Sequence, residues 1–140
     1  MSKLGIIGLG KVGTQVLTDV QQLNLFSEII LIDDRADVAS GEALDHIHSQ
    51  GLINTAHIKI RSGVYQDLTD ADFIVIAASE ATDKNNGDRT LLAQGNHDII
   101  KGIMSQIAEV TQEAVVILIS NPVDSMVYFC LLYTSLSGLA

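Results

Sequence analysis

The chain has 140 residues, of which 47% are hydrophobic and 18% charged, a composition that is typical of one globular domain and not of a chain that is disordered as a whole. Its 17 acidic residues outnumber the 8 basic ones and give a formal net charge of −9, which excludes nucleic acid and anionic membrane surfaces as partners. One cysteine, no secretory signal and no apolar run of the roughly 20 residues that span a bilayer together indicate a cytoplasmic protein without disulfides or a membrane partner.

Apolar runs of strand length alternate with helical patterns along the whole chain. Residues 3–7 predict a first strand, and apolar residues at helical spacing over 12–23 predict a helix with one buried face. Residues 28–33 predict a second strand, whose uninterrupted apolar centre is typical of a parallel strand covered on both faces. A second helix is expected over 38–49, with three side chains turned inward: Ala43, Leu44 and Ile47.

The second half of the chain continues the same alternation. In order, we expect an edge strand over 57–61, a central strand over 72–78, an exposed loop over 79–88, a long helix over 89–110, a buried fifth strand over 114–119 and an apolar helix over 123–133. Strands that alternate with helices in this way predict a parallel sheet wrapped by helices.

A glycine motif, Gly8-Leu9-Gly10-Lys11-Val12-Gly13, lies between the first strand and the first helix. Gly8 permits a tight turn, Gly10 lets the backbone approach a diphosphate, and Gly13 lets the helix pack closely. The helix N-terminus offers unpaired N–H groups and a partial positive charge to phosphate groups. A glycine-rich turn alone is a weak signal, but its place between a strand and an amphipathic helix predicts a dinucleotide site.

An acidic residue, Asp33, ends the second strand 20 positions after Gly13. A carboxylate there accepts hydrogen bonds from the adenosine ribose and repels a 2′-phosphate, so the expected cofactor is NAD rather than NADP. The neighbouring Arg35 leaves NADP open, and Asp34 is expected to point away from the site. The alternative to a cofactor site is that the glycines form an ordinary structural turn and that Asp33 is a solvent-exposed loop residue. That alternative does not explain why the strand, the glycine motif, the helix and Asp33 occur together at this spacing.

The motif and the alternation together predict an α/β fold of the Rossmann type, a doubly wound parallel sheet with five strands in the order 3-2-1-4-5. No linker and no internal repeat divides the sequence. Residues 1–140 are therefore expected to form one dinucleotide-binding domain.

Four sequence segments occur along the chain in this order: residues 8–13 with Asp33, Gly41-Glu42-Ala43-Leu44-Asp45, residues 88–96 and Ser120-Asn121-Pro122-Val123-Asp124. In this order they resemble the L-lactate and malate dehydrogenase family, especially its L-2-hydroxyisocaproate dehydrogenase branch, over roughly residues 3 to 130. The resemblance implies an NAD-dependent oxidoreductase that moves a hydride between NAD and a small 2-hydroxy or 2-oxo acid.

The resemblance also implies roles for individual residues. Arg89 matches the arginine of the mobile active-site loop that polarises the substrate carbonyl, and Asn121 matches the asparagine between the nicotinamide ribose and the substrate. The alternative for Arg89 is a surface residue at the start of a helix, and the alternative for Asn121 is a turn residue before Pro122. The cofactor-binding set implied by the motif and the resemblance is Gly8, Leu9, Gly10, Lys11, Val12, Gly13, Asp33, Ala77, Ala78, Asn96, Ser120 and Asn121.

The loop over 79–88 is expected to lie over the substrate. Malate dehydrogenases carry an extra arginine there for the second carboxylate, and this loop has none before Arg89. Thr82 or Asp83 falls nearest that position, and an aspartate would oppose a dicarboxylate, so a monocarboxylic acid is expected. Lys84 offers a substitute cation and keeps a malate dehydrogenase as the alternative.

The family's histidine–aspartate pair and its carboxylate-binding arginine have no match in this chain. His46, His48, His57 and His97 are expected to have ordinary surface or core roles, and no metal site is expected. The resemblance then implies a domain truncated before the sixth strand and the catalytic domain, inactive alone, from an enzyme that forms a homo-oligomer, either a dimer or a tetramer. Two other functions stay open: a stand-alone NAD-binding module without catalysis, and a methyltransferase.

Overall fold

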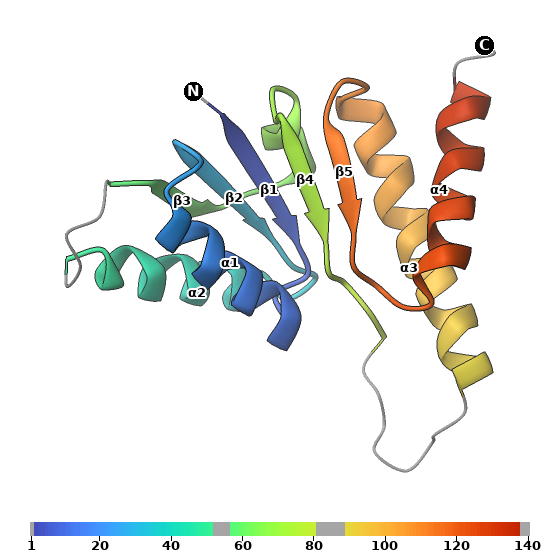
Figure 1. Cartoon of the computed structure of the whole chain (residues 1–140), viewed down its shortest axis with the longest axis horizontal. Helices are drawn as coiled ribbons and strands as arrows, with labels where there is room; N and C mark the ends of the chain where they lie inside the picture. The colour runs from blue at the N-terminus through green and yellow to red at the C-terminus, as the bar shows by residue number, and fades with distance from the viewer. Residues whose placement is uncertain (1, 52–56, 81–88, 138–140) are drawn as a thin grey trace.

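Five parallel strands form one sheet in the order β3-β2-β1-β4-β5, with helices on both faces (Figure 1). The computed structural model describes residues 2–51, 57–80 and 89–137. Its strands are β1 (Lys3–Ile7), β2 (Glu28–Ile32), β3 (Lys59–Ser62), β4 (Phe73–Ile76) and β5 (Val115–Leu118). Its helices are α1 (Lys11–Leu23), α2 (Ala36–Ser49), α3 (Arg89–Val110), α4 (Val123–Ser137) and the 3₁₀ helix η1 (Tyr65–Leu68). This architecture confirms the predicted α/β fold, the Rossmann type and the strand order.

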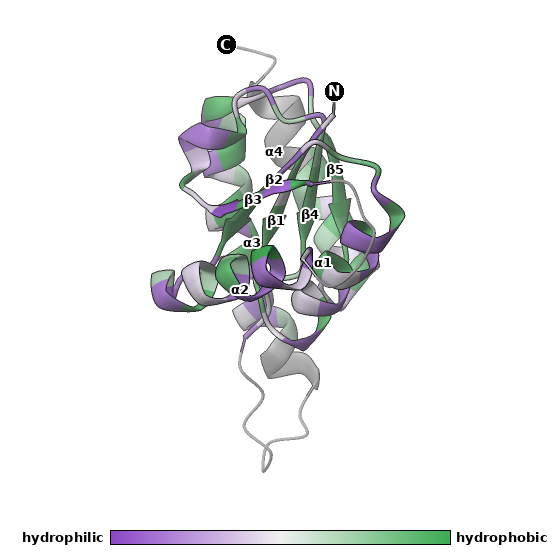
Figure 2. Ribbon diagram, turned by 90° about the vertical axis from the view of Figure 1, so that its left-hand side faces the viewer, coloured by the Kyte–Doolittle hydropathy of each residue, from purple (hydrophilic) through white to green (hydrophobic). Residues whose placement is uncertain are grey.

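The strands form two apolar cores because their successive side chains point to opposite faces of the sheet. In β2, Ile29 and Leu31 pack with α1 and α2, whereas Ile30 and Ile32 pack with η1, α3 and α4. Figure 2 shows the strands as a hydrophobic layer between helices that carry polar residues on their outer sides. The continuous apolar centre of β2 is therefore explained by burial on both faces.

The inward face of the second helix differs from the prediction. On α2, the side chains of Ala39 and Ala43, four residues apart, face the protein core. The side chains of Leu44 and Ile47 are 52% and 46% exposed. The expectation that Leu44 and Ile47 turn inward is wrong because both lie further round the helix than Ala43, Leu44 by about 100°. Two small side chains let α2 approach the sheet closely, a choice that apolar spacing alone did not identify.

The fifth strand also differs from the prediction of a buried strand. β5 lies at the outer edge of the described sheet, and Val115 and Ile117 are 54% and 45% exposed. Its alternate residues Val116 and Leu118 pack toward α3 and α4. In the described part of the chain no helix covers the other face of β5, because α1 packs further along the sheet (Figure 1).

Helix α4 runs to Ser137, four residues beyond the expected end, and packs mainly against α3. Met126 is its buried anchor, at 1% exposure. Val127, Tyr128 and Leu131 are exposed, so α4 keeps an apolar outer side. None of the helices in residues 2–51, 57–80 and 89–137 is long and apolar enough to span a membrane.

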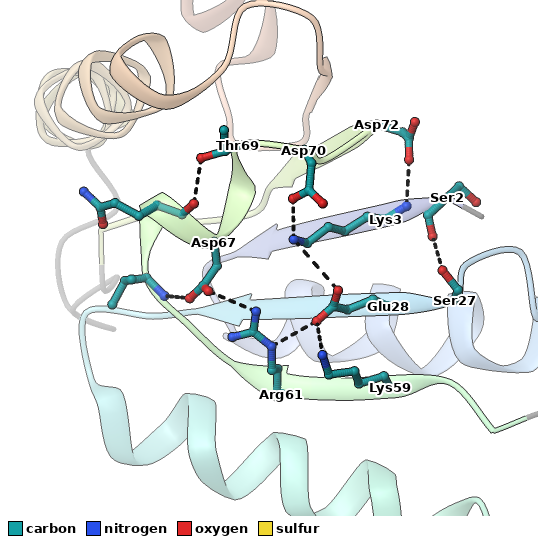
Figure 3. Close-up of polar contacts among 12 residues, drawn as sticks. Ser2, Lys3, Ser27, Glu28, Lys59, Arg61, Asp67, Thr69, Asp70 and Asp72 are labelled. Atoms are coloured by element: carbon teal, nitrogen blue, oxygen red, sulfur yellow. Dashed lines mark hydrogen bonds and ion pairs between the residues drawn. The ribbon is translucent and has the colours of Figure 1, made fainter.

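An ion-pair network lies at the amino ends of the strands (Figure 3). Oε1 of Glu28 lies 3.0 Å from Nζ of Lys59 and accepts a hydrogen bond of 3.0 Å from Nε of Arg61. The largely buried Lys3 pairs with Asp70 at 2.6 Å and with Glu28 at 3.8 Å. Burial tends to raise the pKa of Glu28, but the hydrogen bonds from Lys59 and Arg61 lower it on balance. Cations and carboxylates thus neutralise one another at the edge opposite the glycine motif.

Polar side chains join α1 to α2. Nε2 of Gln21 donates to the carbonyl of His46 at 3.0 Å and to Oγ of Ser49 at 3.2 Å, and Nδ1 of His46 lies 2.5 Å from Oε1 of Gln21. Gln21 is buried within the helix pair. Burial lowers the pKa of His46, and the nearby carboxylates of Glu42 and Asp45 only partly counter this.

Acidification is expected to destabilise the chain through His46. The folded state disfavours the charged ring, whereas the unfolded chain takes up a proton near the ordinary pKa of 6.5. Below that pH the unfolded state binds more protons, so the free energy of unfolding falls as pH falls. Urea unfolding between pH 7.5 and pH 5.5 measures the slope, and His46→Gln is expected to reduce it. His48→Gln on the exposed side of α2 is the control, and equal slopes for both variants would refute the assignment.

Candidate functional site at the carboxyl edge of the sheet

The site lies where the chain direction reverses between the two halves of the sheet. β1 and β4 are neighbours, but the chain leaves β1 toward α1 on one face and leaves β4 toward α3 on the other. Ligands of open α/β sheets bind at the carboxyl ends of strands at such a switch point. The site is therefore formed by residues that follow β1, β2, β4 and β5.

Two glycines of the motif are required by the fold itself. Gly8 has a φ of +91°, and a Cβ atom there would lie 2.4 Å from the amide nitrogen of Ala78. A Cβ atom on Gly13 would lie 1.8 Å from the carbonyl oxygen of Gly8. Both positions exclude any side chain, because backbone atoms cannot give way as a flexible side chain can. The structure therefore packs the turn after β1, the start of α1 and the end of β4 against one another.

The middle glycine is different, because a Cβ atom on Gly10 would meet nothing within 4 Å. Gly10 is the N-cap of α1 with φ −72° and ψ −169°, a backbone conformation open to any residue, and no side chain caps the helix. Lys11 and Val12 in the first turn are exposed. The fold thus leaves open space beside Gly10, next to uncapped N–H groups that favour an anion.

Asp33 follows β2, and its carboxylate holds the glycine motif in place. Oδ2 accepts a hydrogen bond of 2.7 Å from the amide of Leu9, and Oδ1 accepts one of 3.0 Å from the amide of Arg35. The Asp33 side chain is only 6% exposed. Burial tends to raise the pKa of Asp33, but these two amides and the guanidinium of Arg35 lower it on balance, so the group is ionised at neutral pH. The anchoring role of Asp33 was not foreseen from the sequence.

The two neighbours of Asp33 take different positions. The side chain of Asp34 is 93% exposed, and its Oδ1 lies 3.9 Å from Nε of Arg35, so it does not point away from this cluster as predicted. Arg35 is 64% exposed, with Nε 3.6 Å from Oδ1 of Asp33. The positively charged guanidinium of Arg35 therefore lies on the solvent side of Asp33, and most of it is exposed.

On the other side of the switch point, buried side chains join the segments after β4 and β5. Oγ of Ser120 donates to the carbonyl of Ala78 at 2.5 Å. Asn96 on α3 accepts a hydrogen bond of 2.6 Å from the amide of Glu80 and donates one of 2.6 Å to the carbonyl of Asn121. Ser120 and Asn96 are both 5% exposed, whereas Asn121 is exposed.

The structure thus brings together, at one edge, the glycine motif, Asp33 and the residues predicted after β4 and β5. Asn96 lies beneath this edge, with its amide oxygen and nitrogen both bonded to backbone groups. Glu80 was missed by sequence reasoning, because the polar segment after β4 indicated only a loop. Its involvement depends on a contact with α3, 16 residues away.

Other predicted residues fall elsewhere or outside the description. Arg89 is the first residue of α3. Thr82, Asp83 and Lys84 lie in residues 81–88, outside the described residues.

The histidines and possible metal ligands do not form a centre of their own. His97 on α3 packs edge-on against Phe129 of α4, with ring centroids 4.2 Å apart. Within residues 2–51, 57–80 and 89–137, no three histidine, cysteine or acidic residues are grouped as metal ligands would be.

Comparison with known proteins places this site in a family. A family model described as "lactate/malate dehydrogenase, NAD binding domain" matches residues 2–137. L-lactate dehydrogenase 2 of Clostridium acetobutylicum is 39% identical over 130 residues, which cover 92% of this chain and 41% of that protein.

Two solved structures share the fold. A minor L-lactate dehydrogenase from Enterococcus mundtii in a ligands-bound form has a TM-score of 0.88 and 25% identity, over 96% of this chain and 42% of the other. Malate dehydrogenase from Archaeoglobus fulgidus in complex with NADH has a TM-score of 0.86 and 31% identity, over 95% and 45%.

These matches agree with the geometry at the carboxyl edge of the sheet. The chain spans about 41% of the length of the Clostridium relative, and the family model covers nearly all of this chain. The prediction of an NAD-binding domain from the glycine motif and Asp33 is confirmed at the level of the family. The chain belongs to the lactate/malate dehydrogenase family, of which it is the NAD-binding domain.

Proposed function

We propose that this chain is the NAD-binding half of an L-2-hydroxycarboxylate dehydrogenase, which transfers a hydride between NAD and a small 2-hydroxy or 2-oxo acid. One observation carries the proposal. An open space at Gly10, an uncapped helix N-terminus and the ionised carboxylate of Asp33 meet at the switch point of the sheet. The first two features suit a diphosphate, and the third suits the adjoining ribose.

The adenosine half of NAD is assigned to the β1–β2 side of the switch point. The diphosphate would lie beside Gly10 at the amides of Lys11 and Val12, and the ribose would bond to Asp33. Each Asp33 oxygen has one amide partner, and a carboxylate oxygen accepts more than one hydrogen bond, so capacity for ribose hydroxyls is left. A net acidic domain binds an anionic cofactor in this way through backbone N–H groups rather than a lysine patch.

The nicotinamide half is assigned to the β4–β5 side, near Ala77, Ala78, Ser120 and Asn121. When bound, NAD supplies the hydride acceptor, and the protein supplies orientation and charge. The exposed side chain of Asn121 follows β5 at the carboxyl edge, where it would lie between the ribose and the substrate. Arg89, at the start of α3, is assigned to the substrate carbonyl, whose developing negative charge a guanidinium would stabilise.

The proposed substrate is a monocarboxylic acid of the lactate or 2-hydroxyisocaproate type. The segment 79–88 carries no arginine for a second carboxylate, and Asp83 within it would repel one. Malate is the alternative, with Lys84 as the cation. The Clostridium relative is named an L-lactate dehydrogenase, and the Archaeoglobus structure is named a malate dehydrogenase.

We infer that a second half, following this domain, supplies the proton-exchanging histidine–aspartate pair and the carboxylate-binding arginine. The exposed apolar residues Val115 and Ile117 on β5 and Tyr128 on α4 support this inference, since such surfaces are normally covered.

We further propose that the full-length protein is a cytoplasmic homo-oligomer, either a dimer or a tetramer. The exposed side chains of Leu44 and Ile47 on α2 would contribute to the contact between subunits. Sedimentation of the full-length protein at the monomer mass would refute the assembly.

Substitution at Gly10 is expected to separate binding from folding. Gly10→Ala adds a methyl group in space that the fold leaves open but the diphosphate needs, so NADH affinity should fall about tenfold or more with a Tm change within about 2 °C. Gly41→Ala in α2 also adds a methyl group in open space, away from the site, and is the matched control. Titration calorimetry with NADH measures both. No heat with the unsubstituted, folded chain would refute the NAD site.

Substitution at Asp33 is expected to change the preference between cofactors. Asp33→Asn removes the charge that repels a 2′-phosphate, while Arg35 stays available to attract it. The ratio of NADPH to NADH affinity should rise about tenfold, the scale of one charged hydrogen bond. Asp45→Asn, at an exposed carboxylate further along α2, should leave the ratio within about twofold. Fluorescence titrations measure the ratio, and an equal response of the two variants would contradict the assignment.

The purified chain is expected to bind NADH and to catalyse no oxidation. Hydride removal from a hydroxyl-bearing carbon requires a base for the hydroxyl proton, and the family's histidine–aspartate pair has no match here. NADH absorbance with NAD and L-lactate or L-2-hydroxyisocaproate should stay at background. Turnover by the chain alone would overturn the division between halves, and a full-length protein that prefers L-malate would establish the alternative substrate.

A further inference from the structure

One buried polar side chain, that of Asn96, lies beneath the site and bonds only to backbone groups among the described contacts. Asn96, in the middle of α3, is 5% exposed. Its Oδ1 accepts from the amide of Glu80 after β4, and its Nδ2 donates to the carbonyl of Asn121 after β5, both at 2.6 Å. These three groups, called here the Asn96 bridge, connect backbone segments that are 41 residues apart in sequence, from position 80 to position 121.

The chemistry of the bridge suits an amide. One planar group presents an acceptor to an N–H donor and a donor to a carbonyl acceptor. A carboxylate would keep the first bond and place a negative oxygen against the Asn121 carbonyl, and an apolar side chain of similar size would leave both backbone groups unpaired. Of these three side-chain types, only the amide keeps both hydrogen bonds.

The bridge acts on one half of the site. The glycine motif is held by Asp33 through the amide of Leu9, a contact independent of Asn96. The segments after β4 and β5 are held to each other by Ser120 on Ala78 and by the Asn96 bridge. The side-chain anchors of the two halves thus differ: Asp33 bonds to the turn after β1, and Asn96 bonds to the segments after β4 and β5, although the end of β4 also packs against that turn at Gly8.

We propose that Asn96 is a positioning residue that sets where the nicotinamide half of NAD lies, by fixing the backbones of Glu80 and Asn121, and that it makes no contact with the cofactor. This inference rests on the proposed function, because it assigns the nicotinamide half to the β4–β5 side. The sequence-based prediction placed Asn96 among the cofactor-binding residues, and this proposal gives it an indirect role in which it holds the backbone that lies beside the cofactor. Both polar ends of its side chain are bonded to backbone groups, and the residue is buried.

The test compares two ligands that share the adenosine and diphosphate groups. NADH reaches both halves of the site, whereas ADP ends at the diphosphate and lacks the second ribose and the nicotinamide ring. In Asn96→Leu the ratio of NADH to ADP affinity should fall about fivefold or more, the scale of one lost hydrogen bond, with ADP affinity within about twofold. Gln94→Ala removes an amide from an exposed position on the same helix and should change neither affinity.

A ligand-free measurement examines the bridge itself. Glu80 is exposed, yet its amide is bonded to a buried acceptor, so hydrogen exchange at that amide should be slow in the unsubstituted chain. Asn96→Leu should accelerate it about tenfold. Asn96→Asp keeps the acceptor and loses the donor to Asn121, so it should keep the Glu80 amide protected while lowering the affinity ratio.

The outcomes separate the two proposals. An unsubstituted chain that binds neither nucleotide overturns the proposed function. A chain that binds both, with a ratio that Asn96→Leu leaves unchanged or with equal losses for the two ligands, overturns the positioning role alone. Exchange at the Glu80 amide as fast as in an unstructured peptide also overturns it, without any variant.

Discussion

The hydrogen bond from the Leu9 amide to the Asp33 carboxylate is the contact on which the site depends. It joins the turn after β1 to the end of β2, and the absence of side chains at Gly8 and Gly13 lets the same turn pack directly against the end of β4 and the start of α1. A buried carboxylate is stable there because two amides and a guanidinium favour its charged form. With the turn fixed in this way, Gly10 is left beside open space.

The two edges of the sheet handle charge differently. At the amino edge, Lys3, Lys59 and Arg61 pair with carboxylates and leave little net field (Figure 3). At the carboxyl edge, the attraction for an anion comes from uncapped N–H groups of α1, next to the carboxylate of Asp33. Diphosphate binding therefore needs no cluster of basic side chains, which agrees with a formal net charge of −9.

Local patterns predicted the elements well, because the period of apolar residues reflects burial directly. The strands and the long helix α3 followed from that period, whereas the strand order followed from the fold type that the glycine motif indicates. The pattern failed where burial depends on what lies opposite. Leu44 and Ile47 have apolar spacing but lie outside the face that Ala39 and Ala43 present to the sheet, and β5 has an exposed face because no described helix covers it.

The sequence by itself determined the strand–glycine–helix unit, the acid at the end of the second strand and hence the class of cofactor, since each depends on residues close together in the chain. Only the tertiary structure decided that Asp33 also anchors the glycine motif and that Asn96 connects Glu80 to Asn121. These are bonds between a side chain and backbone groups 16 to 25 residues away. No spacing rule encodes such contacts, because they exist only after the sheet and helices have packed.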